Sequence, residues 1–237
     1  MLEGDTDVRI AIHSAEGGVG KTFLACNLAL ALAERGERVT LLDLNLGKLD
    51  ITLRLPPDLL EGRLVSLSSV LSGNSPLPQV LPPFSVVADY PRMETFVEIM
   101  KSGPSMRALS SLLNGLDELT NHIVIDLETG FSPRTTFVLS SADTVIFLTR
   151  GSAVAGVERE ALSLLKKPLI VILSNLPVRS TTASEPQIKP LAEMDLYPEV
   201  WAERYDGSFL LKYKNHKINY LINKILSRLD EVISLWA

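Results

Sequence analysis

The sequence predicts an α/β protein with a doubly wound, mostly parallel sheet flanked by helices. Short apolar runs alternate with longer segments of helical spacing along most of the chain. The runs are apolar throughout and do not alternate with polar residues, which indicates strands covered on both faces. Because 237 residues match one folding unit, we expect a single domain over residues 1–237, without internal repeats or a linker.

Each expected strand contains valine or isoleucine, whose branched side chains favour an extended backbone. The expected strands are Val8–His13, Arg38–Asp43, Phe84–Ala88, Ile123–Asp126, Thr144–Thr149 and Leu169–Leu173. The segments between and after them have apolar residues at helical spacing. The expected helices are Thr22–Arg35, Leu64–Leu71, Met93–Met100, Ser105–Leu119, Pro133–Ser141, Val157–Lys166 and His216–Leu235. Three proline-rich stretches are expected to be surface loops. They are Leu55–Gly62, Ser72–Pro83 and Pro177–Pro190.

The composition indicates a globular chain and excludes several classes of function. Hydrophobic residues make up 46% and charged residues 22%, which argues against disorder. No apolar run approaches the roughly 18 residues that a membrane span needs. The net charge of −5 does not favour nucleic acid or an anionic membrane as the main target. The acidic N-terminal residues contain no evident signal peptide. A single cysteine fits a reducing compartment, so we expect a cytoplasmic protein.

Cysteine and histidine do not suggest a metal cluster. Cys26 is the single cysteine, which excludes an intrachain disulfide and any site needing several thiolates from one chain. Its apolar neighbours predict a small buried residue. The chain has three histidines, His13, His122 and His216, and their spacing is not that of metal ligands.

The segment Ser14–Thr22 reads Ser-Ala-Glu-Gly-Gly-Val-Gly-Lys-Thr and connects the first expected strand to the first expected helix. Glycines let a backbone fold around an anion with its N–H groups directed inward, and the helix start adds a positive dipole end. Lys21 can reach the outer phosphates of a nucleotide, and the Thr22 hydroxyl can ligate Mg²⁺. This is the pattern of a Walker A loop, with Ala15 at its first glycine position.

The doubled glycine before Val-Gly-Lys-Thr resembles the deviant Walker A family, which includes MinD, ParA, FlhG, CpaE, TadZ and the nitrogenase iron protein. The resemblance extends to about Asp206, is greatest to the FlhG and CpaE/TadZ branches, and implies one P-loop NTPase-like domain that binds ATP and Mg²⁺. The family loop begins with a lysine that contacts the nucleotide of a partner subunit. Glu16 stands at that position, and a carboxylate cannot donate to a phosphate, so this departure puts a family-type homodimer in doubt.

The segment Leu41–Asp50 is similar to the family's second motif. Asp43 matches the first aspartate of that motif, at a strand end near the expected γ-phosphate and Mg²⁺. The family's second aspartate positions the attacking water, and Asn45 takes its place here. An amide can hold a water but cannot accept its proton, so general-base help of roughly 10²–10⁴-fold is expected to be missing. A strand end followed by an ordinary polar loop is the alternative interpretation.

The segment Ile123–Gly130 matches a Walker B motif, in which an apolar strand delivers one carboxylate to its C-terminal end. Asp126 is expected to bind a water of Mg²⁺. Gly130 would let the following backbone approach the γ-phosphate. Glu128 is a further candidate for orienting water, and a solvated loop carboxylate is the alternative.

Asn175 follows the last expected strand, where the family contacts adenine with an asparagine. An amide supplies the donor and acceptor that the adenine edge requires. A residue that only starts the turn before Pro177 is the alternative interpretation. The segment Arg204–Asp206 stands where the family has a turn that closes over the base, although its match to that motif is poor.

The resemblance therefore implies three sets of site residues. The nucleotide-binding residues are Gly17, Gly18, Val19, Gly20, Lys21, Thr22, Phe23 and Asn175. The metal-associated residues are Thr22, Asp43 and Asp126. The catalytic residues are Lys21, Asp43 and Asn45.

Residues 216–237 have the three-four spacing of an amphipathic helix. The polar face carries nearly balanced charges, so we expect the helix to pack on the domain; binding of a membrane is the alternative. The cluster Lys212, Lys214, His216 and Lys217 is interpreted as a solvated helix start.

Two hypotheses follow for the function. The first is a MinD/ParA-like ATP-binding switch for spatial positioning or assembly, with weak or absent hydrolysis and with protein partners in a localised machine at a membrane or cell pole. The second is a pseudo-ATPase scaffold without turnover, which Glu16 and Asn45 favour. A ParA-type DNA-partition ATPase is a third alternative, for which the composition reveals no basic face.

Overall fold

The computed structural model describes residues 8–102, 105–150, 157–175, 190–195, 197–203 and 206–235. Strands and helices alternate along these residues as the sequence predicts. The strands are β1 Val8–His13, β2 Val39–Leu44, β3 Leu64–Ser66, β4 Phe84–Ala88, β5 His122–Leu127, β6 Thr144–Thr149, β7 Leu169–Ser174 and β8 Ala192–Met194. The helices are α1 Lys21–Glu34, α2 Ile51–Arg54, α3 Pro57–Leu60, α4 Leu67–Leu71, α5 Met93–Ser102, α6 Met106–Asp117, α7 Pro133–Ser141, α8 Val157–Leu165, α9 Pro198–Ala202, α10 Phe209–Lys212 and α11 Ile218–Ser234.

The described strands form one eight-stranded sheet in the order β3-β4-β2-β5-β1-β6-β7-β8, and every pairing is parallel. In the pairing of β2 with β5, Asp43 lies opposite Asp126. Because the strands are parallel, their carboxyl ends share one edge, where ligands bind in open α/β sheets. This topology confirms the predicted doubly wound fold.

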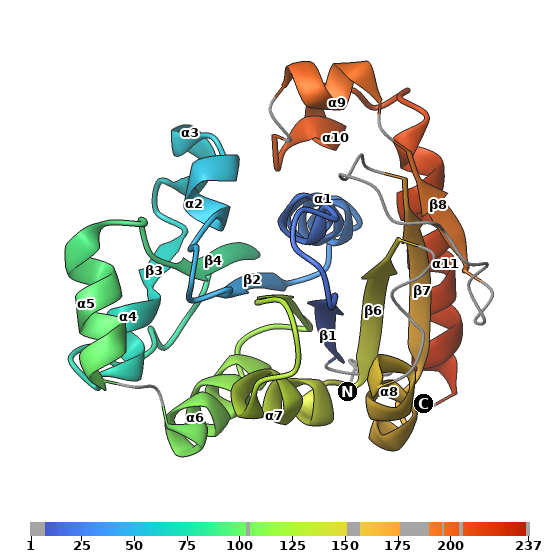
Figure 1. Ribbon diagram of the computed structural model, residues 1–237. Helices are drawn as coiled ribbons and strands as arrows, with labels where there is room; N and C mark the ends of the chain where they lie inside the picture. The colour runs from blue at the N-terminus through green and yellow to red at the C-terminus, as the bar shows by residue number, and fades with distance from the viewer. Residues whose placement is uncertain are drawn as a thin grey trace.

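Helices cover both faces of the sheet (Figure 1) and create two hydrophobic cores. On one face, Ile10 and Ile12 of β1 pack in a core with residues of α1, α10 and α11. On the other face, Ala11 belongs to a core with residues of α4, α6 and α7. Neighbouring residues of one strand therefore enter opposite cores, which explains why the strands are apolar throughout.

The prediction of one helix over Leu64–Leu71 was wrong. Residues Leu64–Ser66 form the short strand β3, which pairs with β4 at the edge of the sheet. Ser66 then caps α4, because its side chain accepts a hydrogen bond from the Ser69 N–H. A capping serine favours a helix start at the next residue and interrupts any helix that would run through it.

Several short elements were missed by the sequence analysis. The expected loop Leu55–Gly62 contains α3, with Pro57 in its first turn, where proline is favoured. The elements α2, β8, α9 and α10 were not predicted, and each has only three to five residues. Such segments are too short for a hydrophobic period to emerge. Most of the expected loop Pro177–Pro190 lies outside the described residues.

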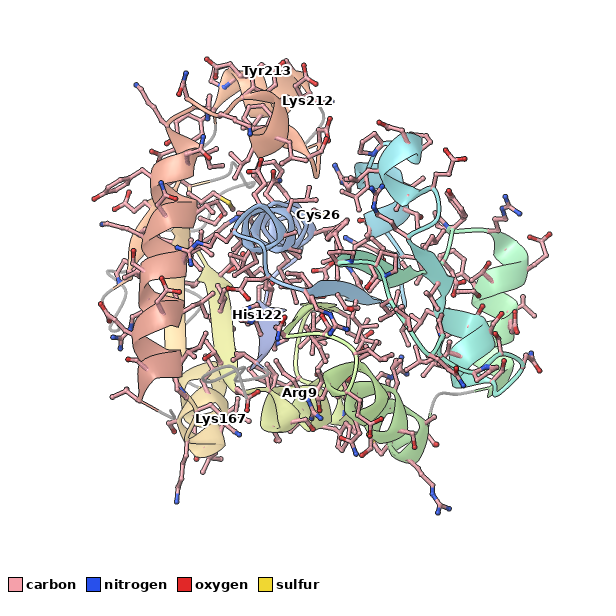
Figure 2. All side chains as sticks on the ribbon, turned by 180° about the vertical axis from the view of Figure 1, so that it is seen from behind. Arg9, Cys26, His122, Lys167, Lys212 and Tyr213 are labelled. Atoms are coloured by element: carbon pink, nitrogen blue, oxygen red, sulfur yellow. The ribbon has the colours of Figure 1, made fainter. Side chains whose placement is uncertain are left out.

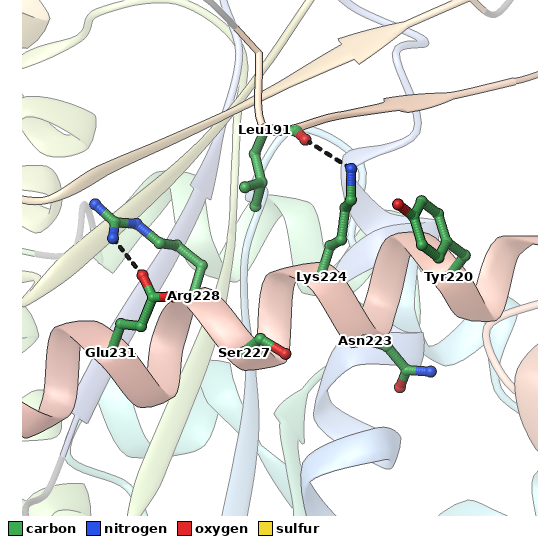
Figure 3. Close-up of a pocket in the computed structure, with 7 residues that line it drawn as sticks. All are labelled: Leu191, Tyr220, Asn223, Lys224, Ser227, Arg228 and Glu231. Carbon is green, nitrogen blue, oxygen red and sulfur yellow. Dashed lines mark hydrogen bonds and ion pairs between the residues drawn. The ribbon is translucent and has the colours of Figure 1, made fainter.

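Helix α11 lies along β7 and β8 at one side of the molecule (Figure 1). Its apolar side chains are buried in the core that also contains α1. Its outer face contributes to a groove of about 510 Å³ next to Leu191 (Figure 3). In the groove, Lys224 lies over the Tyr220 ring and Arg228 pairs with Glu231. Of the helices within the described residues, none is long and apolar enough to cross a membrane.

Cys26 lies on α1 at the interface with the segment that leads into α10 (Figure 2). Its side chain is fully buried, as the sequence predicts, and burial raises the pKa of the thiol. A Cβ on Gly207 would lie 2.7 Å from the Cβ of Cys26. Because this distance is too short for two carbons, glycine is required for the close contact between the two segments.

Candidate nucleotide and magnesium site

The segment Ser14–Gly20 forms a loop between β1 and α1 at the carboxyl edge of the sheet. Gly18 and Gly20 adopt left-handed backbone conformations, with φ of 72° and 93°, which glycine reaches without strain. Helix α1 begins at Lys21, and Gly20 has no side chain to cap it. The first N–H groups of an α-helix have no partner within the helix and carry its positive dipole end. The loop therefore presents a site suited to an anion.

Two serines fix carbonyl groups of this loop. The Ser14 hydroxyl donates to the Glu16 carbonyl at 2.6 Å. The Ser174 hydroxyl, at the end of β7, donates to the Val19 carbonyl at 3.0 Å. Because the C=O and N–H groups on either side of a trans peptide bond point in opposite directions, a fixed carbonyl also fixes the following N–H. The loop is thus held in a defined shape by the chain itself.

Lys21 is buried beside the loop, and its side chain points back to β1. Its Nζ lies 2.9 Å from the Ser14 hydroxyl, and only 6% of the residue is exposed. Burial lowers the pKa of Lys21 to about 8, against the opposing effect of the Asp126 carboxylate. The ammonium group is thus poorly solvated, so it would attract an anion in the loop strongly.

Asp43 and Asp126 form a buried pair at the ends of β2 and β5. Both side chains are fully buried. Asp43 accepts hydrogen bonds from the N–H groups of Asn45, at 3.0 Å, and Ile51, at 3.2 Å. Burial and the neighbouring Asp126 raise the pKa of Asp43. Burial also raises the pKa of Asp126, to about 6.

The Thr22 hydroxyl connects the helix start to this carboxylate pair, because it donates to Asp126 Oδ2 at 2.7 Å. The other oxygen, Oδ1, is buried without a hydrogen-bond partner. A buried carboxylate oxygen without a partner is costly, and a hydrated cation would satisfy it. Carboxylates, a hydroxyl and phosphate oxygens are the ligands that Mg²⁺ prefers. The residues present therefore fit Mg²⁺, which Thr22, Asp43 and Asp126 would hold.

The segment after β5 contacts the phosphate loop directly. Gly130, with φ of 79°, donates its N–H to the Ser14 carbonyl at 3.1 Å. Glu128 accepts a hydrogen bond from Ser132 at 2.9 Å, and Ser132 caps α7. This contact gives Glu128 a structural role at the start of α7, which is different from the proposed orientation of water.

Asn45 lies two residues beyond Asp43, and only 7% of it is exposed. Its carbonyl accepts the N–H groups of Lys48 and Leu49, which turns the chain into α2. The residue is thus held close to the carboxylate pair. Its side chain is an amide, where the family's second motif has an aspartate.

A contact that the sequence analysis missed connects Glu16 to Arg150. Arg150 follows β6, and its Nη1 lies 3.2 Å from Glu16 Oε2. Its Nη2 donates to the Gly18 carbonyl at 2.8 Å. The two residues are separated by 134 positions in the chain, so neither periodicity nor local spacing predicts the contact.

The side chains of the remaining expected residues make contacts outside the loop. The Phe23 side chain packs against Phe209 in the core, so only its backbone remains for a nucleotide. Asn175 is exposed at the end of β7 and donates to Glu193 and Asp195, at 3.0 and 2.7 Å. Asp206 accepts from Ser208 at 2.7 Å. The other two residues of its expected motif, Arg204 and Tyr205, are outside the described residues.

His13 is buried at the end of β1, immediately before the loop. Its ring contacts Phe131 and Phe147, with centroids at 5.0 and 5.9 Å. Burial, with a further contribution from Lys21, lowers the pKa of His13 to about 4. The imidazole is therefore neutral at physiological pH and adds no charge to the site.

Residues 10–181 match the model of the CobQ/CobB/MinD/ParA nucleotide-binding domain. The chain belongs to this family. The match covers β1 with its phosphate loop and extends through the Walker B strand β5 to β7.

Curated relatives are similar in sequence to part of the chain. An uncharacterised ATP-binding protein of Methanocaldococcus jannaschii is 31% identical over 59% of this chain and 51% of its own length. The antiactivator FleN of Pseudomonas aeruginosa is 32% identical over 59% of this chain and 49% of its own length. The chain thus spans about half the length of these relatives.

Solved structures of the family share the fold over nearly the whole chain. MinD from Pyrococcus horikoshii, complexed with Mg-ADP, has a TM-score of 0.76 at 23% identity and covers 98% of this chain and 99% of its own. A ParA-family ATPase from Chlorobium tepidum has a TM-score of 0.69 at 17% identity and covers 92% of this chain and 97% of its own. At these identities the likeness establishes the MinD-type P-loop NTPase fold.

Proposed function

We propose that this MinD/ParA-like chain binds ATP·Mg²⁺ and acts as a spatial or assembly switch with slow or absent hydrolysis. The observation that carries the proposal is the convergence of Lys21, Thr22 and the Asp43–Asp126 pair beside the phosphate loop. This arrangement has a cation for the phosphates, a hydroxyl for the metal and a buried carboxylate oxygen that needs a partner. The Mg-ADP complex of the MinD relative supports nucleotide and Mg²⁺ as the ligands.

In this site the residues of the chain would bind and orient the nucleotide. The loop N–H groups and Lys21 would hold the phosphates, and Lys21 would stabilise the charge that develops if water attacks the γ-phosphate in line. Mg²⁺ supplies further charge neutralisation when it is bound. Asn175, which follows β7, would contact adenine in this proposal, and its hydrogen bonds to Glu193 and Asp195 would then have to rearrange.

Thermal unfolding with and without ATP·Mg²⁺ tests the binding proposal. A ligand at a hundredfold excess over its dissociation constant adds about 2.7 kcal/mol, which corresponds to a rise of roughly 5–10 °C in a domain of this size. Lys21→Ala is expected to abolish the rise, because it removes the cation from the loop. No rise for the wild-type protein would favour the second candidate function, a scaffold that has lost nucleotide binding.

Slow hydrolysis is inferred from Asn45, which cannot accept a proton from water. Asn45→Asp is therefore expected to raise the single-turnover rate of ATP hydrolysis by roughly 10²-fold, whereas Asn45→Ala leaves the low wild-type rate unchanged. The inference fails if the wild-type protein already hydrolyses ATP as fast as the Asp variant. The same amide also supports the scaffold alternative, because a scaffold does not need turnover.

We further propose that the partners are proteins of a localised machine, and that the chain acts in the cytoplasm or is recruited from it. The MinC:MinD complex of Aquifex aeolicus, with a TM-score of 0.69 at 20% identity over 94% of this chain and 96% of its own, supports a protein partner. A DNA-partition role is the less favoured alternative. Salt-dependent retention of the purified chain on non-specific DNA would favour it.

A further inference from the structure

The Glu16–Arg150 pair bridges the phosphate loop and the end of β6. The guanidinium of Arg150 contacts the loop twice, through the Glu16 carboxylate and the Gly18 carbonyl. Only 14% of the Arg150 side chain is exposed, compared with 36% for Glu16. An arginine has a planar fork of donors, so it can hold two acceptors in a fixed relation where a lysine provides a single point charge.

Arg150 adds a third side-chain contact to the carbonyl groups of the loop. The Glu16 and Val19 carbonyls are held by Ser14 and Ser174, and Arg150 holds the Gly18 carbonyl between them. The N–H groups that follow these three carbonyls belong to Gly17, Val19 and Gly20, and each points away from its fixed carbonyl within the peptide plane. A charged donor on the Gly18 carbonyl also polarises that peptide and makes the Val19 N–H a stronger donor.

The pair also changes the electrostatics of the loop. An unpaired carboxylate at position 16 would repel the phosphates of a nucleotide. With Arg150 at 3.2 Å, the negative charge of Glu16 is balanced within the same chain. The opposite charge therefore comes from the end of β6, and a second copy of the chain is not needed to provide it.

We propose that Glu16 and Arg150 form a clamp that completes the phosphate site within one chain. Arg150 is a positioning residue: it fixes the Gly18 carbonyl and, through it, the Val19 N–H. Glu16 helps to hold Arg150 in place through the ion pair at 3.2 Å. This inference rests on the proposed function, since the clamp serves the binding of the nucleotide phosphates.

Calorimetric titration of ATP·Mg²⁺ into four variants tests the clamp. Arg150→Gln leaves Glu16 unbalanced and is expected to weaken binding roughly 10-fold or more, equivalent to about 1.4 kcal/mol. Arg150→Lys keeps the charge without the fork and is expected to give an intermediate affinity. Adding Glu16→Gln to Arg150→Gln removes the repulsion and is expected to restore part of the affinity. Glu16→Gln alone should weaken binding less than Arg150→Gln.

A matched control is Arg35→Gln, which removes the same charge from an exposed pair with Asp230 at 3.0 Å. It is expected to leave the affinity for ATP·Mg²⁺ unchanged. Thermal unfolding of each variant without nucleotide shows that it is folded. The diagnostic readout is the partial rescue of Arg150→Gln by Glu16→Gln, which a purely structural role of the arginine would not produce.

The outcomes separate this inference from the proposed function. If the wild-type protein binds ATP·Mg²⁺ and Arg150→Gln binds equally well, or if Glu16→Gln does not rescue it, the clamp is refuted and the proposed function stands. If the wild-type protein does not bind ATP·Mg²⁺ at all, the proposed function fails and the clamp fails with it.

Discussion

At the scale of single residues, Asp126 would serve the proposed Mg²⁺ binding, but its buried charge lowers the stability of the folded protein. Its carboxylate is fully buried next to Asp43 at the end of β5. Burial raises its pKa to about 6, above the value of about 3.9 expected in the unfolded chain. The folded protein therefore binds this proton more tightly than the unfolded chain, so the free energy of unfolding falls as the pH rises from about 4 to about 6 and stays lower above pH 6.

Asp126→Asn is accordingly expected to stabilise the nucleotide-free protein. The gain should be on the order of 3 kcal/mol above pH 6, where the wild-type carboxylate is charged, and should decrease as the pH falls from about 6 to 4. Urea unfolding of both proteins across this range measures the difference. The same variant should lose the Mg²⁺ dependence of ATP binding. An Asn variant that is less stable than the wild type at pH 7.5 would contradict this account of the buried pair.

Sequence patterns predict residues of the site that belong to contiguous motifs. Lys21, Thr22 and Asp126 follow from local spacing and a strand end, and the structure brings them together. Arg150 could not be predicted, because its contact with Glu16 depends on β6 lying next to β1 in the sheet. Side-chain directions also escaped prediction, as for Phe23, whose ring belongs to the core.

At the scale of elements, long periodic segments are predictable and short ones are not. The strand β1 and helix α7 have the predicted bounds, because apolar patterning and a proline at the helix start agree there. The strand β3 depends on pairing with β4, and no three-residue pattern can show such a partner. The apolar residues of Leu64–Leu71 also fit a helical period, so the sequence alone predicts one helix there.

Helix α11 offers a direct test of how an amphipathic helix is used. Ile225 is fully buried between this helix and the domain, whereas Leu235 at the helix end is 78% exposed. Ile225→Ala is expected to lower the free energy of unfolding by about 2–5 kcal/mol, and Leu235→Ala by less than about 0.5 kcal/mol. Chemical denaturation measures both. Equal and small effects would mean that the helix does not pack on the domain in solution and would support the membrane or partner alternative.

At the scale of the whole molecule, the carboxyl edge of the sheet gathers residues that are far apart in the chain. The loop after β1, the ends of β2 and β5, and the residue after β6 lie together at this edge, where they would form the proposed phosphate and metal site. This convergence follows from the parallel order of the strands. Because Arg150 balances the negative charge of Glu16, both of these charges beside the loop come from one chain.

The most direct test is the stoichiometry and Mg²⁺ dependence of ATP binding, measured by calorimetric titration at protein concentrations where sedimentation shows a monomer. The account predicts one ATP per chain, bound more tightly with Mg²⁺ than without it, and loss of that difference in Asp126→Asn. The account would be contradicted by the absence of binding, or by binding that occurs only when two chains associate.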